Sequence, residues 1–322
     1  MRRRLITAGA TFIVVYLLNF IIPRLEPGNF IASLSDQTDL LPEQRLKIIQ
    51  MFGLDQPISV QFVNYLRQTL LTFPPNFGFS FSDYPMTVLQ LISIYLPWTL
   101  LLIMVSQAIA WPLGIVIGTM VAWRQGSFVD STILAISSFM WGVPSYWLAN
   151  IFIFVFSINL HLLPPSLLGT GFSSFNLLSR VSEILTHSAL PILTLVALNL
   201  PGYAVVMRNT MIRVKQEDFM LAAEARGLSS RTLMFAHGAR NALLPSVTNI
   251  AHAFGNVLSG AYLIEITYSY PGMGYLISQA AFSRDLPVLQ GVFFFSALLV
   301  IMSNVLADVA YVILDPRIEY RS

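Results

Sequence analysis

The chain has 322 residues, of which 55% are hydrophobic and only 11% are charged, and its mean hydropathy is +0.68. Water-soluble domains carry far more charge, so this composition predicts an integral membrane protein. The absence of cysteine excludes disulfides, thiolate metal sites and cysteine catalysis. The net charge of +2 comes without a basic, aromatic-interleaved stripe, so no nucleic acid is expected as a partner.

Long apolar runs predict six transmembrane helices, because about 20 apolar residues are needed to cross a bilayer. The third run is interrupted by Gly142 and Pro144, which a kinked span tolerates when its neighbours satisfy the freed backbone groups. The six predicted spans are Leu5 to Ile22, Leu96 to Trp123, Ser131 to Ile158, Leu190 to Met207, Leu244 to Ile266, and Leu286 to Leu314.

Basic residues orient these spans, since Lys and Arg gather on the cytoplasmic side of a membrane protein. Six spans place both termini on one side, and twelve of the 18 Lys and Arg residues fall there, including Arg2, Arg3 and Arg4. Both termini and the polar stretch between the fourth and fifth spans are therefore expected on the cytoplasmic side.

A large external segment follows the first span. Pro57 can begin a helix there that carries Ile58, Phe62, Tyr65 and Leu66 on one side. Farther on, Phe77, Phe79 and Phe81 alternate, either as a short strand or as wedges buried against the membrane domain, and the second reading is favoured. A second external stretch, from Asn159 to His187, reads as a loop with little secondary structure.

The stretch from Arg213 to Pro245 is polar, yet it carries strong helix signals. Glu217 and Asp218 open a helical pattern, since acids suit a helix N-terminus, and Gly227 stands where a glycine would end the helix. The spacing predicts one helical face made of Phe219, Ala222, Ala223 and Arg226. Ser229 or Ser230 can cap a second short helix that continues through Leu233, Ala236 and Arg240. The stretch can be a docking helix for another protein or a simple connector between spans.

The fifth span carries a polar stripe at helical spacing, made of Asn249, His252, Asn256 and Ser259. Such a stripe can line a translocation path, together with Asn199 of the fourth span, or it can hold helices together by hydrogen bonds. Glu265, near the outer end, can gate the mouth or lie in the wet interface, and the interface is favoured. The four histidines show no ligand spacing, so no metal site is predicted.

Several strings resemble one known family. The stretch ending in RNALLP resembles the cytoplasmic loop of ATP-binding cassette (ABC) importer permeases, most closely the dipeptide/oligopeptide subfamily, which also includes permeases for nickel and oligosaccharides. The strings RQGSFVD, IEITYSYPGMG and ADVAYVILDPRIEY are similar to the same subfamily. One departure is that Leu221 and Glu224 stand where that subfamily usually has basic residues.

The resemblance implies an all-α integral membrane protein with the type I ABC importer permease fold and a large external segment. It identifies an ATPase-coupling helix made of Phe219, Met220, Leu221, Ala222, Ala223, Glu224, Ala225, Arg226, Gly227 and Leu228. The implied division is a cytoplasmic N-terminus and first helix (1–23), an external helical segment (24–95), a core transmembrane domain (96–314) with a coupling loop (209–244), and a cytoplasmic tail (315–322).

The implied location is the inner membrane of a prokaryotic cell. The implied partners are a second homologous permease, two ATP-binding subunits, an external solute-binding protein and the lipid bilayer. The resemblance implies ATP and Mg²⁺ in the partner ATPases, and no cofactor is expected in this chain, which has no GxxxxGK[ST] phosphate cradle. Neither GxSxG nor HExxH is present, so the chain is not expected to be an enzyme. Two hypotheses remain: the membrane half of an ATP-driven importer of short peptides or oligosaccharides, and an ion-coupled transporter or channel that works alone.

Overall fold

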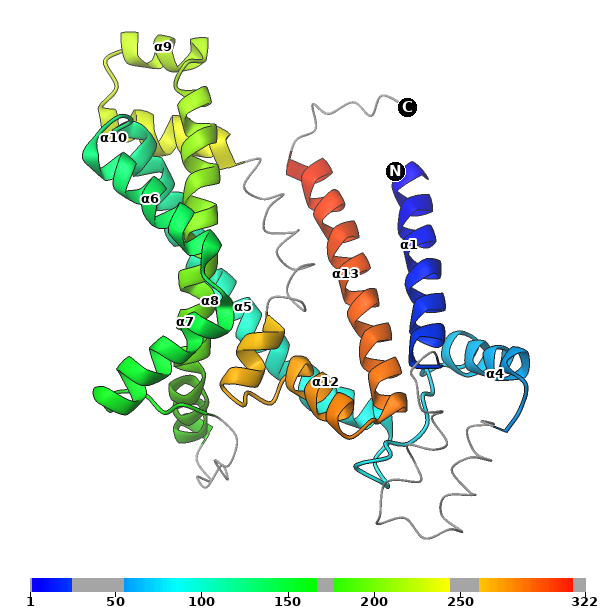
Figure 1. Cartoon of the computed structure of the whole chain (residues 1–322). Coiled ribbons are helices and arrows are strands. Elements are labelled where there is room, and N and C mark those ends of the chain that lie inside the picture. The colour runs from blue at the N-terminus through cyan, green and yellow to red at the C-terminus, as the bar shows by residue number, and fades with distance from the viewer. Residues whose placement is uncertain (1, 25–54, 167–176, 244–260, 315–322) are drawn as a thin grey trace. The chain divides into compact units, whose positions relative to one another are not determined.

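The computed structural model describes residues 2–24, 55–166, 177–243 and 261–314 (Figure 1). Helices dominate these residues, and their only β pairing is an isolated bridge between Phe79 and Thr87. The helices are α1 (Arg2–Ile21), η1 (Ile22–Arg24), α4 (Ile58–Leu70), α5 (Val88–Trp123), α6 (Phe128–Gly142), α7 (Ser145–Phe152), η2 (Ile153–Asn159), α8 (Leu177–Val214), α9 (Asp218–Ala225), α10 (Ser230–Thr232), η3 (Leu233–Ala239), α12 (Met273–Phe282) and α13 (Leu286–Leu314).

Three helices of the described residues are long and apolar enough to cross a membrane: α5, α8 from Ser179, and α13 as far as Ser303. The pair formed by Phe128–Gly142 and Ser145–Asn159 adds a fourth if it counts as one span, although it is bent by 105°. The break falls at Val143 and Pro144, where the sequence predicts an interruption. α1 is apolar over Gly9–Ile21, and the predicted fifth span lies largely outside the described residues.

Two element boundaries differ from the sequence prediction. α5 begins at Val88 rather than Leu96, and α8 begins at Leu177, so the last part of the predicted Asn159 to His187 loop is helical. The α5 extension, Val88 to Tyr95, has no charged residue and continues the apolar span, whereas the α8 extension carries Arg180 and Glu183. Neither stretch contains a proline or glycine that would stop the helix earlier.

The chain divides into two compact units. The first contains Met1–Pro97 and Tyr275–Ile301, and the second contains Trp98–Gly274 and Met302–Ser322. In the first unit, α4 packs on α1 through aromatic rings, and Tyr16 and Tyr65 stack with their centroids 4.9 Å apart. The wedge interpretation of the Phe77 region is confirmed for Phe77 and Phe81, which are both buried, and Phe77 packs against Phe294 of α13.

Asp285 organises the connection that precedes α13 in the first unit. Its wholly buried carboxylate accepts hydrogen bonds from the Ser80 hydroxyl at 2.5 Å and from the backbone N–H of Phe81 at 2.7 Å. Its other oxygen accepts from the Val288 N–H, which caps the start of α13. One acid therefore fixes both the loop that precedes α5 and the start of the last helix.

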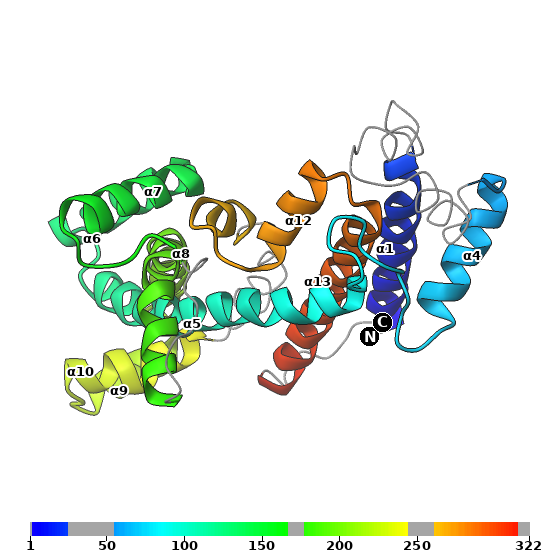
Figure 2. The ribbon, with the colours of Figure 1, turned by 90° about the horizontal axis from the view of Figure 1, so that it is seen from below.

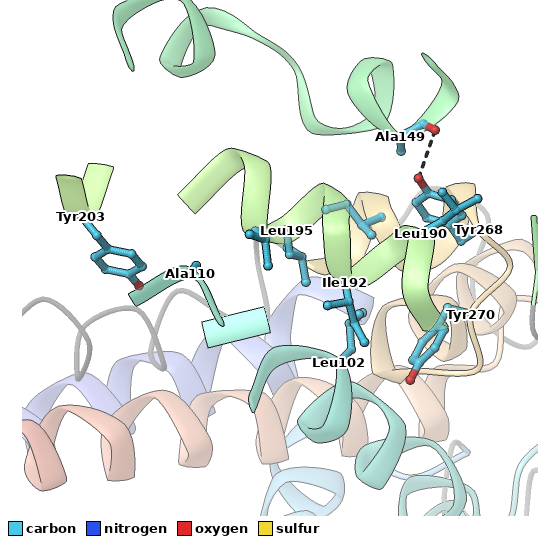
Figure 3. Packing of buried hydrophobic residues seen from close by; sticks show 11 residues of the cluster. Leu102, Ala110, Ala149, Leu190, Ile192, Leu195, Tyr203, Tyr268 and Tyr270 are labelled. Carbon is cyan, nitrogen blue, oxygen red and sulfur yellow. Dashed lines mark hydrogen bonds between the residues drawn. The ribbon is translucent and has the colours of Figure 1, made fainter. Parts of the chain in front are cut away.

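The second unit has an apolar core formed by residues of α5, α7 and α8 and by those around Tyr268 (Figure 3). Figure 2 shows the three helices from below. The Tyr268 hydroxyl lies 2.8 Å from the Thr194 hydroxyl, and it donates to the backbone carbonyl of Ala149 at 3.1 Å. The buried Tyr203 donates to Gln107 at 2.7 Å. These bonds satisfy polar groups that would be costly to bury alone.

Two glycines let α5 and α8 approach closely. Gly114 and Gly118 are four residues apart on one face of α5, the small-xxx-small pattern of tight membrane helix packing. A Cβ at Gly118 would overlap the Ala204 carbonyl and the Met207 side chain, and one at Gly114 would overlap Tyr203. The two backbones are therefore in contact, and larger residues cannot be placed at either glycine without separating the helices.

We expect Gly118→Ala to lower the thermal midpoint of the purified protein, since overpacking at a tight contact costs about 1–3 kcal/mol. Gly9→Ala is the matched control, because a Cβ at Gly9 of α1 meets nothing within 4 Å. That control should be neutral or slightly stabilising, because alanine favours a helix over glycine. Equal midpoints for the two variants would show that α5 and α8 are not in contact there.

Candidate functional site

The segment that follows α8, residues 215–239, contains α9, α10 and η3 and is called the α9 loop below. Its helix begins where the sequence predicts: Glu217 is the N-cap residue, Asp218 opens the helix, and Arg226 is the C-cap residue. Gly227 has φ +75, a left-handed conformation that glycine adopts without strain, and its N–H donates to the Glu224 carbonyl at 2.9 Å. The predicted termination is therefore confirmed.

The second helix of the loop also starts as predicted, since the Ser229 hydroxyl accepts from the Thr232 N–H at 3.3 Å and caps α10. α10 runs straight into η3, a π-helix from Leu233 to Ala239. π-Helices are rare and often occur at functional sites. Gly238 in η3 lets the side chain of Met211 of α8 lie against its backbone.

α9 has an inward face and an outward face. Met220 and Ala223 are buried and form a small core with Leu233 of η3, which is completed by Trp123, Val214 and Leu228. Leu221 is 58% exposed and Phe219 40%. Ala222, Glu224, Ala225, Arg226 and Gly227 are exposed too.

The predicted helical face is therefore wrong for one residue, Ala223. Phe219, Ala222 and Arg226 face solvent together, whereas Ala223 points inward with Met220. The spacing left this choice open, because Ala222 and Ala223 are adjacent and equally small. Packing against Leu233 decides it.

The α9 loop is fastened to two spans. Met207 and Met211 of α8, Ala122 of α5, and Ala239 in η3 with Ala242 beyond it form one buried cluster. The ammonium of Lys215 lies 5.0 Å from the centroid of the Trp123 ring, within cation–π range. The loop therefore packs directly on the ends of α5 and α8.

A buried ion pair lies at the same end of α8. Arg208 forms two hydrogen bonds to Asp130 of α6, one from Nε to Oδ1 and one from Nη2 to Oδ2 at 2.7 Å. Asp130 is 3% exposed and also accepts from the Gly126 N–H at 2.9 Å. Ser127 caps α6, with its hydroxyl accepting from the Asp130 N–H. Two-point contacts between Arg and a carboxylate fix geometry as well as charge.

This ion pair explains much of the RQGSFVD string. Gly126 has φ +80 and makes the turn, Ser127 caps the helix, and Asp130 holds the turn to α8. The resemblance to the family singled out this string but did not explain why these residue types occur in it. Asp130 and Arg208 are 78 positions apart, so only the fold brings them together.

The predicted translocation residues are only partly placed. Asn199 is half-buried in α8, and its amide donates to the Leu195 carbonyl one turn earlier at 2.7 Å. Asn249, His252, Asn256 and Ser259 lie outside the described residues. Their role as a path, or as hydrogen-bonding groups between helices, stays a prediction.

Glu265 differs from its prediction. It is wholly buried rather than in a wet interface. Its carboxylate accepts from the Thr99 hydroxyl of α5 at 2.7 Å and from the Gly274 N–H at 2.6 Å, and Gly272 lies directly against it. Thr99 in turn accepts from the Met273 N–H at 2.7 Å. Glu265 therefore caps the first turn of α12, where the helix dipole favours a negative charge.

The residues around Glu265 explain the YPGMG part of the second string. A side chain at Gly272 would overlap the Glu265 carboxylate, so glycine is required by close approach. Nearby, burial raises the pKa of Tyr270 to about 12, so its hydroxyl stays neutral at physiological pH. This hydroxyl lies 3.5 Å from that of Ser188 in α8.

The described residues contain no group of three or more His, Asp or Glu side chains that could hold a metal ion. The described part of the site consists of an exposed helix, a π-helix beneath it, and packing contacts that hold both to long apolar helices.

Comparison with known proteins fits this arrangement. The family described as "Binding-protein-dependent transport system inner membrane component" matches residues 114–320. The chain is 32% identical over 318 residues to the "Oligopeptide transport system permease protein AppB" of Bacillus subtilis, covering 99% of this chain and 98% of that protein. It is 33% identical over 320 residues to the "Probable peptide ABC transporter permease protein y4tP" of Sinorhizobium fredii, with the same coverage.

The chain thus belongs to the family of inner membrane components of binding-protein-dependent transport systems. It is a multi-pass membrane protein, and the resemblance stated from the sequence is confirmed.

We expect Asp130→Ala to lower the thermal midpoint strongly, because Arg208 and the Gly126 N–H would lose their acceptor, at a cost of about 2 kcal/mol. Asp218→Ala is the matched control, since Asp218 also stands in the first turn of a helix but is exposed. Loss of the Asp218 carboxylate should lower the free energy of unfolding by at most about 1 kcal/mol. Thermal unfolding in lipid nanodiscs compares the two, and equal shifts would contradict a structural role for the ion pair.

Proposed function

We propose that the chain is the permease subunit of an ATP-driven importer and forms half of the path for short peptides. Its peptide-transporting relatives support the substrate class, although oligosaccharides remain the alternative cargo. A second homologous permease would complete the path. Two ATP-binding subunits, which hold ATP and Mg²⁺, would drive it, and an external solute-binding protein would deliver the substrate.

One observation carries this proposal: the inward face of α9 packs on η3, and its outward face is exposed to solvent. Met220 and Ala223 fix the helix to η3, while Phe219, Leu221 and Ala222 are exposed. A connector needs neither a packed underside nor an exposed apolar face. A helix that docks in a groove of another protein needs both.

The charged residues of α9 support a contact with the ATPase that is both polar and apolar. Glu224 and Arg226 are exposed beside Leu221, so the face that meets the ATPase carries both charges around an apolar centre. The polar rim and apolar middle are typical of protein interfaces. In the proposed topology this face and both termini lie in the cytoplasm, as the basic residues predict.

The second hypothesis, a channel or ion-coupled transporter that works alone, has no specific observation in its favour. Internal acidic ion sites are typical of such transporters. The buried acids of the described spans, Asp130 and Glu265, are instead engaged with Arg208 and with backbone and hydroxyl donors.

We expect Ala222→Trp to reduce ATP-driven peptide uptake about tenfold or more, which corresponds to about 1.4 kcal/mol of lost docking. The bulky side chain would stand on the outward face without disturbing the core beneath it. Gly227 is a less suitable target, because any other residue there is strained by φ +75 and would alter the loop itself.

Ala236→Trp is the matched control, since Ala236 is an exposed alanine of η3 outside α9. Both variants are assembled with their partner subunits in proteoliposomes, and uptake and ATP hydrolysis are measured together. Normal uptake in Ala222→Trp, or equal losses in both variants, would contradict a docking role for α9.

A further inference from the structure

The second half of α4 lies beside the membrane-embedded part of α1. At the start of α4, Gln61 accepts from Arg24, which follows α1, at 3.1 Å. Near its end, Thr69 lies 2.6 Å from the hydroxyl of Tyr16. Later residues of α4 therefore contact earlier residues of α1, so α4 approaches the membrane interior toward its C-terminal end.

The depth of this contact follows from helix geometry. Tyr16 precedes Ile22, where the apolar run of α1 ends, by six residues, or about 9 Å along the helix. The hydrocarbon core of a bilayer is about 30 Å thick, so Tyr16 is well inside it. Beyond the loop that follows α4, Phe77 packs on Phe294, whose ring centroid lies 6.3 Å from that of Tyr16. The loop is held at this depth on both sides.

The residues between these two contacts are mostly apolar and exposed, with Thr72 and Asn76 as the polar exceptions. Phe73 is 96% exposed, Leu71 74%, and Leu70 43%, and Val63 on the same flank of α4 is 61% exposed. The exposed side chains of α1 at this level, Leu17 and Leu18, are apolar as well. The flank therefore continues the surface that α1 presents to lipid.

Part of the loop backbone is satisfied within the protein, although the N–H groups of Thr72 and Phe73 donate to no backbone carbonyl among the described residues. The N–H groups of Leu71 and Asn76 donate to the carbonyls of Arg67 and Gln68, at 3.2 and 3.0 Å. Pro74 and Pro75 have no N–H, and the Thr72 hydroxyl donates to the Arg67 carbonyl. In lipid, backbone polar groups must be satisfied within the protein.

We propose that Leu70, Leu71 and Phe73 insert among the acyl chains of the membrane leaflet nearer Arg24. α4 then lies as a membrane-interface helix, with the polar flank of Asn64 and Gln68 toward water. The long stem of Arg67, at the border, lets its charge reach the headgroups. A surface of this kind fits lipid rather than the solute-binding protein, and it requires only that the chain spans a membrane.

Because the chain has no cysteine, each introduced cysteine is the only labelling site in it, and spin labels can test the proposal directly. Phe73→Cys, Gln68→Cys and Leu18→Cys are each spin-labelled in the full chain, assembled with its partner subunits in lipid nanodiscs. Collisions of the label with oxygen, which concentrates in lipid, are compared with collisions with a water-soluble nickel chelate. Leu18 is the lipid-facing reference and Gln68 the water-facing one.

We expect the oxygen-to-nickel collision ratio at Phe73 to match that at Leu18 and to exceed that at Gln68 severalfold. A ratio like that of Gln68 would place the flank in water and overturn the proposal. Protection from both reagents, with or without added binding protein, would show a protein occupant and overturn it too. Leu71→Cys provides the same comparison if Phe73→Cys does not assemble.

Discussion

Backbone contact between α5 and α8 is the constraint on which the second unit depends. Lipid offers no hydrophobic drive to bring two apolar helices together, so close packing has to supply the attraction. Gly114 and Gly118 allow that packing against Tyr203 and Ala204. Met207, one turn farther along α8, joins the cluster that carries η3, so the position of the α9 loop follows from this single helix contact.

Buried acids fix the ends of helices in both units. Asp130 stands in the first turn of α6, Glu265 accepts from the start of α12, and Asp285 accepts from the start of α13. Each is almost wholly buried, and each is satisfied by several donors. A carboxylate at a helix N-terminus is stabilised by the dipole and the free N–H groups together. These three buried acids thus hold turns and connections in place.

Local chemistry predicted local structure well. The limits of α9 followed from Asp218 and Gly227, the cap of α10 from Ser229, and the start of α4 from Pro57, because each depends only on neighbours in sequence. The family and the transport class followed from strings of adjacent residues in the same way. The close contact at Gly114 and Gly118 was not predicted, because its partner helix is distant in sequence.

Contacts between distant residues could not be predicted. Nothing near Asp130 in the sequence points to Arg208, and nothing near Glu265 points to Thr99. Glu265 was therefore assigned to an interface by its position near the end of a span, whereas its donors bury it. Ala222 and Ala223 could be told apart only by what packs beneath α9.

The central claim is that this chain works as one part of an ATP-driven importer, with α9 as its contact to the ATPase. Its most direct test is to purify a tagged chain from its native membrane in mild detergent and to identify by mass spectrometry what stays bound. The account predicts two Walker-motif ATPases and a second permease. A chain that emerges alone, and moves solute into liposomes without ATP, would contradict it.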